Sequence, residues 1–199
     1  MFYRRFMWGL ANGVLMLAIA GAFWMGIVAA SSRGRMAAAG LMTIGAVSLF
    51  CGFLALRRKS AGFKLSELKN GNAEEQRILR DVNAGFRRIA IFETVLASVA
   101  VGAVEYLHRL DLLWPALGLA VSLHFIPVGR LFHLRTYYAT AALGSLVCLI
   151  GLLPIPAPSK PLWVGYGMAA VMWGSAGWLL VRSERLAANS PAAKMASVP

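Results

Sequence analysis

Long apolar runs separated by short charged segments make up most of this chain. Six runs can be distinguished, covering approximately residues 6–30, 36–56, 89–107, 112–129, 136–153 and 162–181. A helix needs about 20 mostly apolar residues to cross the hydrocarbon core of a membrane. The pattern therefore predicts an all-α integral membrane bundle of about six transmembrane helices, of which the fourth and fifth are the shortest.

The composition and the placement of Lys and Arg refine this picture. Only 14% of the residues are charged, against about 25% in soluble domains. If the N-terminus is cytoplasmic and the spans alternate, 16 of the 20 Lys and Arg residues fall in cytoplasmic segments, as the positive-inside rule requires. We therefore expect an N-in, C-in protein of the cell (inner) membrane. The net charge of +12 is then a topology signal attracted to anionic lipid headgroups, so we expect membrane lipids and no nucleic acid as partners.

We expect one transmembrane domain over residues 1–186 and a disordered tail over residues 187–199. The cytoplasmic loop 57–88 should contain an amphipathic helix over residues 73–84 that lies along the headgroups and runs into the third span, with a bend at Gly85. Ile78, Val82 and Phe86 share one face of that helix. A membrane-surface linker is the favoured interpretation of this loop, and a docking surface for a partner or for anionic lipid is the alternative.

Two further features concern packing. The connection from Pro154 to Pro161 contains four prolines, which predicts a stiff, non-helical strap between the fifth and sixth spans. Small residues recur four apart, as in Gly165/Ala169 and Ala170/Gly174. Such spacing lets helices approach closely, and we expect it to serve packing within the bundle.

Glu93 and His124 are the candidate functional pair. Glu93 lies four residues into the third span and His124 six residues before Arg130, which places them at depths of roughly 6 Å and 9 Å from the same membrane face. Consecutive spans joined by a short loop are usually antiparallel neighbours. We therefore expect the two side chains to lie within direct or one-water hydrogen-bond reach, as a pair that changes its charge near neutral pH.

Other polar side chains should join this pair in the cytoplasmic half of the bundle. Asn12 reaches a similar depth, and Tyr137, Tyr138 and Thr140 enter the fifth span from the same side. The grouping predicts a substrate- or proton-binding site open to the cytoplasm. The alternative is a satisfied polar network that fixes helix packing.

The remaining charged residues have more ordinary interpretations. Glu105 and Arg109 are spaced for a local ion pair, and Glu105, His108 and Asp111 do not project from one helical face, so we expect no metal site there. Arg130 and Arg135 are expected to contact lipid headgroups, and Pro127 and Gly129 predict that the fourth span ends or bends before them.

The stretch from Ser122 to Tyr138, with HFIP followed by a phenylalanine and a pair of tyrosines, resembles small uncharacterised bacterial multi-spanning membrane proteins. The resemblance implies no activity. Cys51 and Cys148 fall within spans and are interpreted as small packing residues. The chain has no GxSxG, P-loop, HExxH or CxxC motif, and we expect no cofactor and no catalytic residue.

Three functions remain. The first is a small transporter or channel, with or without proton coupling, that forms a homo-oligomer because six short helices enclose little volume. The second is a noncatalytic subunit that docks a membrane partner through residues 57–88. The third is a lipid-modifying enzyme that uses His124 as acid or base and Arg130 as phosphate ligand, although Glu93 is the only acidic residue available deep within the spans.

Overall fold

The computed structural model describes residues 2–31, 35–59 and 73–188. All regular structure in these ranges is helical, and six helices are long and apolar enough to cross a membrane. They are α1 (Phe2–Ser31), α2 (Arg35–Lys59), α4 (Ala73–Tyr106), α5 (Leu113–Phe132), α6 (Arg135–Leu152) and α7 (Lys160–Ala188), with 3-10 turns η1 (Leu110–Leu112) and η2 (Ala157–Ser159). The predicted all-helical fold with six candidate spans is confirmed, and it indicates a multi-pass membrane protein.

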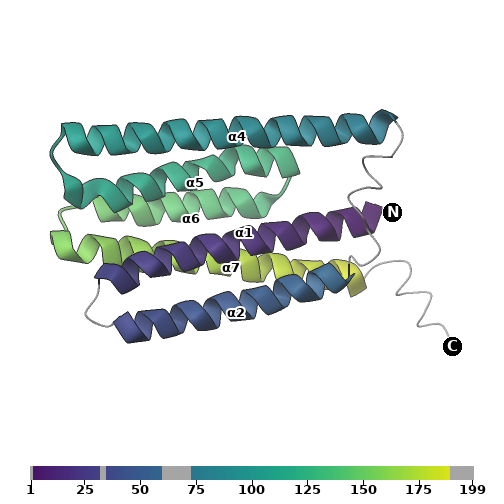
Figure 1. The fold of residues 1–199 in the computed structure, drawn as a ribbon, viewed down its shortest axis with the longest axis horizontal. Helices are drawn as coiled ribbons and strands as arrows, with labels where there is room; N and C mark the ends of the chain where they lie inside the picture. Colours follow the sequence, from purple (N-terminus) through teal and green to yellow (C-terminus); the bar gives the residue numbers. More distant parts are fainter. Residues whose placement is uncertain (1, 32–34, 60–72, 189–199) are drawn as a thin grey trace.

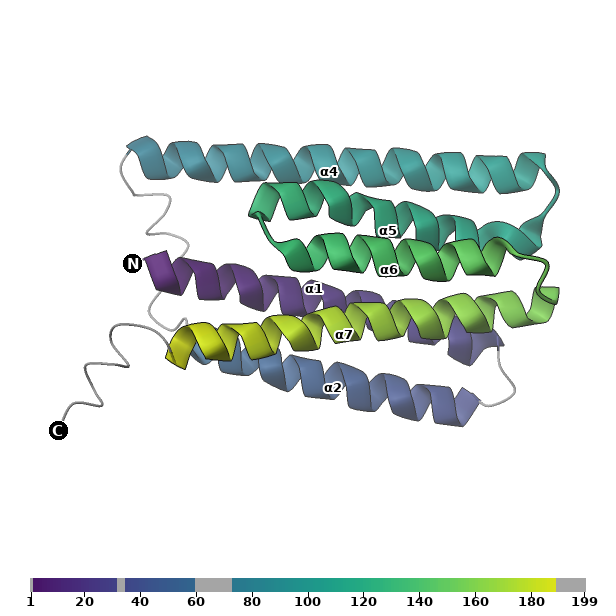
Figure 2. The same ribbon diagram turned by 180° about the vertical axis from the view of Figure 1, so that it is seen from behind.

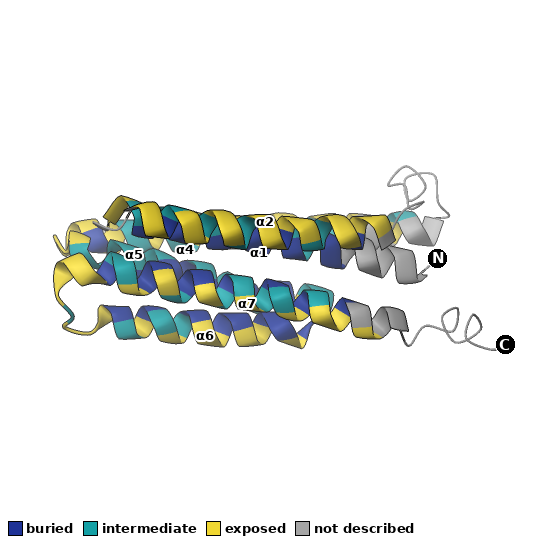
Figure 3. Cartoon of the chain, turned by 90° about the horizontal axis from the view of Figure 1, so that it is seen from below, coloured by how far each residue is buried: buried dark blue, intermediate teal, exposed yellow. Residues whose placement is uncertain are grey.

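The helices form an elongated bundle in which the chain runs up and down (Figure 1). α7 packs along α1 and α6, α2 packs on α1, and α5 lies between α4 and α6. The view from behind shows the same order, with α2 and α4 at the two flanks (Figure 2). The face of α2 in Figure 3 is largely exposed, and α4, which lies on the far side in that view, is equally little buried. Since these faces are apolar, lipid or protein must cover them in a membrane.

Most described Lys and Arg side chains gather at one end of the bundle, which we call the basic end. It contains the start of α4 and the ends of α2, α5 and α7 (Figure 1), with Arg57, Arg58, Arg77, Arg80, Arg87, Arg88, Arg130, Arg135, Arg182 and Arg185. The described basic side chains at the opposite end are Arg109 and Lys160. That the basic end faces the cytoplasm stays a prediction.

α4 is one continuous helix of 34 residues and runs straight in Figures 1 and 2, without the bend expected at Gly85. Gly85 instead allows close packing, because a Cβ there would lie 2.7 Å from Leu131 Cδ1. Residues 60–72 of the expected loop and the Ile78 side chain lie outside the described part. Val82 is half-buried, and Phe86 is exposed on one side while its ring lies 5.3 Å from that of Phe132. The amphipathic face therefore stays a prediction.

α5 continues through Pro127 to Phe132, so it does not end before Arg130, and the alternative of a bend at Pro127 and Gly129 stays a prediction. The helix ends at His133, which adopts the left-handed conformation with φ 53° and donates its backbone N–H to the Gly129 carbonyl. That bond caps one of the free carbonyls of the last turn.

The proline-rich connection is also more helical than expected. Ala157–Ser159 forms a 3-10 turn, and α7 begins at Lys160 with Pro161 in its first turn, where the missing proline N–H has no helical partner in any case. At its other end α7 extends to Ala188, so residues 187 and 188 are helical, and residues 189–199 of the expected tail lie outside the described part.

Aromatic side chains packed against glycines hold the helices together. The Trp173 ring of α7 lies against Gly21 of α1 and Gly45 of α2, and its Nε1 donates to the Ala18 carbonyl at 3.2 Å. Gly165 packs against α1, as expected for internal packing. Ala170 and Gly174 are exposed instead, so that pair serves no contact within the described bundle.

Candidate functional site

The antiparallel packing of α4 on α5 places Glu93 and His124 at the same position along the helix axes. Gly85 packs against Leu131, and the Phe86 ring packs against that of Phe132. About two turns further along α4, Glu93 faces His124. The register is constant because both helices rise by the same amount per residue. The matched depth argued from the sequence is therefore realised, and the structure brings Glu93 and His124 together.

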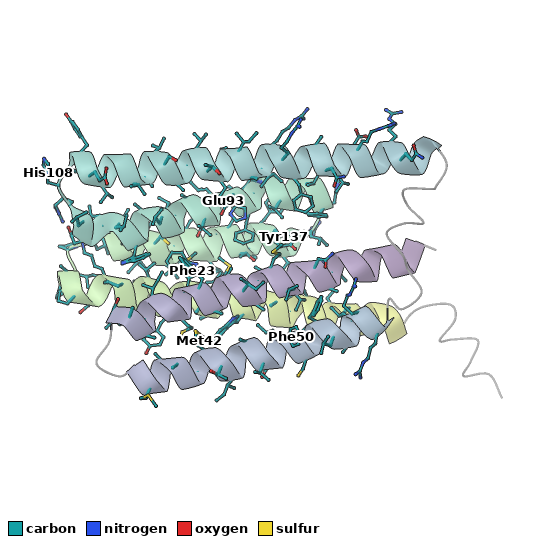
Figure 4. All side chains as sticks on the ribbon, in the orientation of Figure 1. Phe23, Met42, Phe50, Glu93, His108 and Tyr137 are labelled. Carbon is teal, nitrogen blue, oxygen red and sulfur yellow. The ribbon has the colours of Figure 1, made fainter. Side chains whose placement is uncertain are left out.

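His124 Nδ1 lies 3.7 Å from Glu93 Oε1. This distance allows charge attraction but exceeds that of an N–H···O hydrogen bond. The His124 side chain is 15% exposed and that of Glu93 is 40% exposed. Figure 4 shows Glu93 where α4 faces α5. The pair therefore lies at the flank of the bundle, with the carboxylate accessible from outside and the imidazole behind it.

The buried His124 Nδ1 has no hydrogen-bond partner of good geometry among the described residues. A buried polar atom left in this state costs about 1–3 kcal/mol. This nitrogen can donate or accept a hydrogen bond according to the tautomer of the imidazole, so a polar group that approached the pair from the exposed side of Glu93 could satisfy it.

Aromatic rings connect His124 to the centre of the bundle. The His124 and Phe125 rings lie 4.3 Å apart, and the Phe125 ring stacks on Tyr137 of α6 at 6.0 Å and 10°. Both Phe125 and Tyr137 are 7% exposed. A Cβ on Gly13 of α1 would lie 2.6 Å from the Tyr137 hydroxyl oxygen. Tyr137 thus reaches α1 beside the predicted site residue Asn12, which is half-buried.

Tyr138 does not belong to this group. Its side chain is 41% exposed and its ring packs on the α5 backbone at Gly129, 3.2 Å from the position of an added Cβ. Neighbouring residues on a helix point about 100° apart, so only one tyrosine of the pair faces the interior. Figure 4 shows that one, Tyr137, between α6 and α1.

Arg130 and Arg135 are exposed at the basic end, on either side of the turn between α5 and α6. This position fits the expected contact with lipid headgroups, which stays a prediction. His133 between them serves the backbone turn described above.

At the opposite end, Asp111 is the centre of an ion-pair network. Arg109 donates to it from Nε at 2.9 Å and from Nη2 at 3.1 Å, and Lys160 Nζ donates at 2.7 Å. Hydrogen bonding to Asp111 and its negative charge raise the pKa of the Arg109 guanidinium. The predicted Glu105–Arg109 pair is wrong, because α4 ends at Tyr106 and the turn swings Arg109 towards Asp111. No three metal-ligating side chains form a cluster in the described ranges.

A seam of hydroxyl and sulfur atoms includes Thr140, which was expected beside the Glu93–His124 pair, and three residues that were not predicted to take part: Ser122, Met168 and Ser175. The Thr140 and Ser175 hydroxyls lie 2.6 Å apart, and the Sγ of Cys148 and the hydroxyl of Ser122 each lie 3.7 Å from Met168 Sδ. These atoms join α5, α6 and α7 in the core. The sequence signal that could have predicted this seam is the presence of small polar residues within apolar runs. Such residues form hydrogen bonds between helices in membranes. Cys148 is buried as a packing residue, whereas Cys51 is exposed on the bundle surface.

Comparison with known proteins found no matching family model, no matching curated protein and no matching solved structure. The function therefore has to be argued from the site itself.

Proposed function

We propose that this chain is a small proton-linked transporter or channel of the cell membrane that works as a homo-oligomer. One observation carries the proposal: a carboxylate and an imidazole face each other 3.7 Å apart on adjacent candidate spans, Glu93 on α4 and His124 on α5. Ionisable groups within a membrane are costly and usually serve function. An imidazole is also the side chain that most readily exchanges a proton near neutral pH.

The position of the pair supports an oligomer. Phe125 and Tyr137 fill the space on the inner side of His124, and Glu93 is open towards the flank. A substrate would therefore reach the pair along the outer surface of α4 and α5. A second copy covering this flank would enclose a path between the two bundles.

Reconstitution in liposomes tests the proposal. Pools of small ions and metabolites are applied under an imposed pH gradient while charge movement is recorded on a supported membrane. We expect a substrate-dependent current that changes with the gradient. Glu93→Gln and His124→Gln should each lower it at least about tenfold, since general acid–base groups typically contribute a factor of 100 or more.

Glu105→Gln and His108→Gln are the matched controls, because they make the same chemical changes at the exposed end of α4. Both should retain the current. Equal currents in the pair variants and in the wild-type protein would exclude a role for Glu93 and His124 in proton coupling.

A noncatalytic partner subunit is the second candidate, and the length of α4 favours it. Phe86 lies over Phe132, the last residue of α5, so residues 73–84 extend past α5 by roughly 18 Å. Arg77, Arg80 and Asp81 are exposed on this extension. Deletion of residues 60–80 should abolish co-purification of a partner if docking is the function, and should leave proton-linked currents intact if transport is.

A further inference from the structure

A surface pocket of about 240 Å³ lies at the basic end of α7, lined by Trp178, Val181, Arg182 and Arg185. The spacing of these four residues places them on one face of the helix. Trp178 is 55% exposed and Val181 is 45% exposed, so the face points away from the bundle. It is distinct from the Glu93–His124 pair, which lies on α4 and α5.

Two rows of residues, each spaced four apart, lead into the pocket: Gly174, Trp178 and Arg182 in one, and Gly177, Val181 and Arg185 in the other. A Cβ added at either glycine would meet no atom within 4 Å. Each row therefore passes from a glycine that faces open space, through an apolar side chain, to a guanidinium group. The length from Gly174 to Arg185 is about 16 Å, enough for much of an acyl chain.

The charge at the end of the rows is uncompensated within the described part of the chain. No described carboxylate lies within ion-pair distance of Arg182 or Arg185. The candidate span of α7 ends at Ser183, so both guanidinium groups lie at the level of lipid headgroups. A guanidinium presents a planar fork of N–H donors that matches a phosphate group.

We propose that this face of α7 is a binding site for an anionic phospholipid. The headgroup phosphate lies between Arg182 and Arg185, and an acyl chain follows Trp178 along the open helix surface at Gly174. The apolar part of the site selects an amphiphile over a free phosphate ion, because inorganic phosphate has nothing to bury against the indole ring.

Native mass spectrometry of the full chain in detergent tests the site, with phosphatidylglycerol and phosphatidylcholine of the same acyl chains as probes. We expect phosphatidylglycerol to remain bound and phosphatidylcholine to dissociate. Arg182→Gln together with Arg185→Gln should weaken phosphatidylglycerol binding about 25-fold, since each basic side chain near an anionic surface contributes about a factor of five. Arg87→Gln with Arg88→Gln, which removes the same charge from the basic end of α4, should bind as the wild-type protein does.

Gly174→Leu tests the contribution of the acyl chain to binding separately from that of the headgroup. The substitution puts a bulky side chain where the acyl chain would lie, keeps both arginines and suits an exposed helix, so it should weaken phosphatidylglycerol binding without loss of folding. Unchanged binding in the double arginine variant or in Gly174→Leu would overturn the proposal. Displacement of the lipid by millimolar inorganic phosphate would also overturn it, by identifying a free-anion site.

Discussion

Lys160 is 2% exposed, and its ammonium group lies 2.7 Å from the carboxylate of Asp111, 49 positions earlier in the chain. The contact ties the turn between α4 and α5 to the first residue of α7. A cation is unfavourable at a helix N-terminus, and the carboxylate offsets that cost. Arg109 binds the same carboxylate with two hydrogen bonds.

Removal of the Asp111 charge should destabilise the protein. Asp111→Asn leaves the buried Lys160 ammonium without its anion, so the free energy of unfolding should fall. Denaturant titration in mixed micelles measures it. Glu105→Gln is the control and should change stability little, and Lys160→Met should relieve much of the loss in Asp111→Asn.

The contact between α1 and α6 at Gly13 should tolerate no added methyl group. Gly13→Ala would bring Cβ to 2.6 Å from the Tyr137 hydroxyl oxygen, whose ring is held by Phe125 and Phe132. Overpacking of this kind costs about 1–3 kcal/mol. Combination with Tyr137→Phe, which removes that oxygen, should recover most of the loss. A full loss in the double variant would show that the hydroxyl is not the obstacle.

His133 should be replaceable by glycine with a gain in stability. Its φ of 53° lies in the left-handed region, which costs an L-residue about 1–2 kcal/mol and glycine nothing. After allowance for the greater freedom of glycine in the unfolded chain, His133→Gly should raise the free energy of unfolding by about 0.5–1 kcal/mol. His133→Ala, which keeps the Cβ, should give no gain in the same titration.

The Glu93–His124 pair should show coupling in a double-mutant cycle. His124→Ala leaves the carboxylate without its partner and should lower stability or activity. Glu93→Gln and His124→Gln combined should perturb folding less than either change alone. The interaction energy from the cycle should be about 0.5–3 kcal/mol. Additive losses would show that the two side chains do not interact despite their separation of 3.7 Å.

Reporter fusions test the orientation. Reporters placed after Ser60 and after Arg185 should read as cytoplasmic, and one inserted between Pro154 and Pro161 as external, because the positive-inside rule assigns the basic end to the cytoplasm. A reversed signal from the reporter after Ser60 or from the reporter after Arg185 would contradict the proposed topology.

The sequence determined the number and approximate limits of the helices. A span must bury its backbone hydrogen bonds internally and present about 20 apolar residues to lipid, so hydropathy alone reveals it. The same constant rise per residue placed Glu93 and His124 at one depth before their contact was known. Both inferences depend on distance along a helix axis, which residue number measures directly.

Tertiary structure decided what depends on rotation about those axes and on turns. Tyr137 faces the interior and Tyr138 the surface because α6 packs against α5 and α7, and the Tyr137 hydroxyl then reaches Gly13 of α1. Arg109 binds Asp111 because the chain leaves the helix after Tyr106, and Lys160 joins them only when α7 returns to the same end of the bundle. In an apolar helix nearly every face is similarly hydrophobic, so the choice of contact face is made by shape complementarity between helices, which the local sequence does not encode.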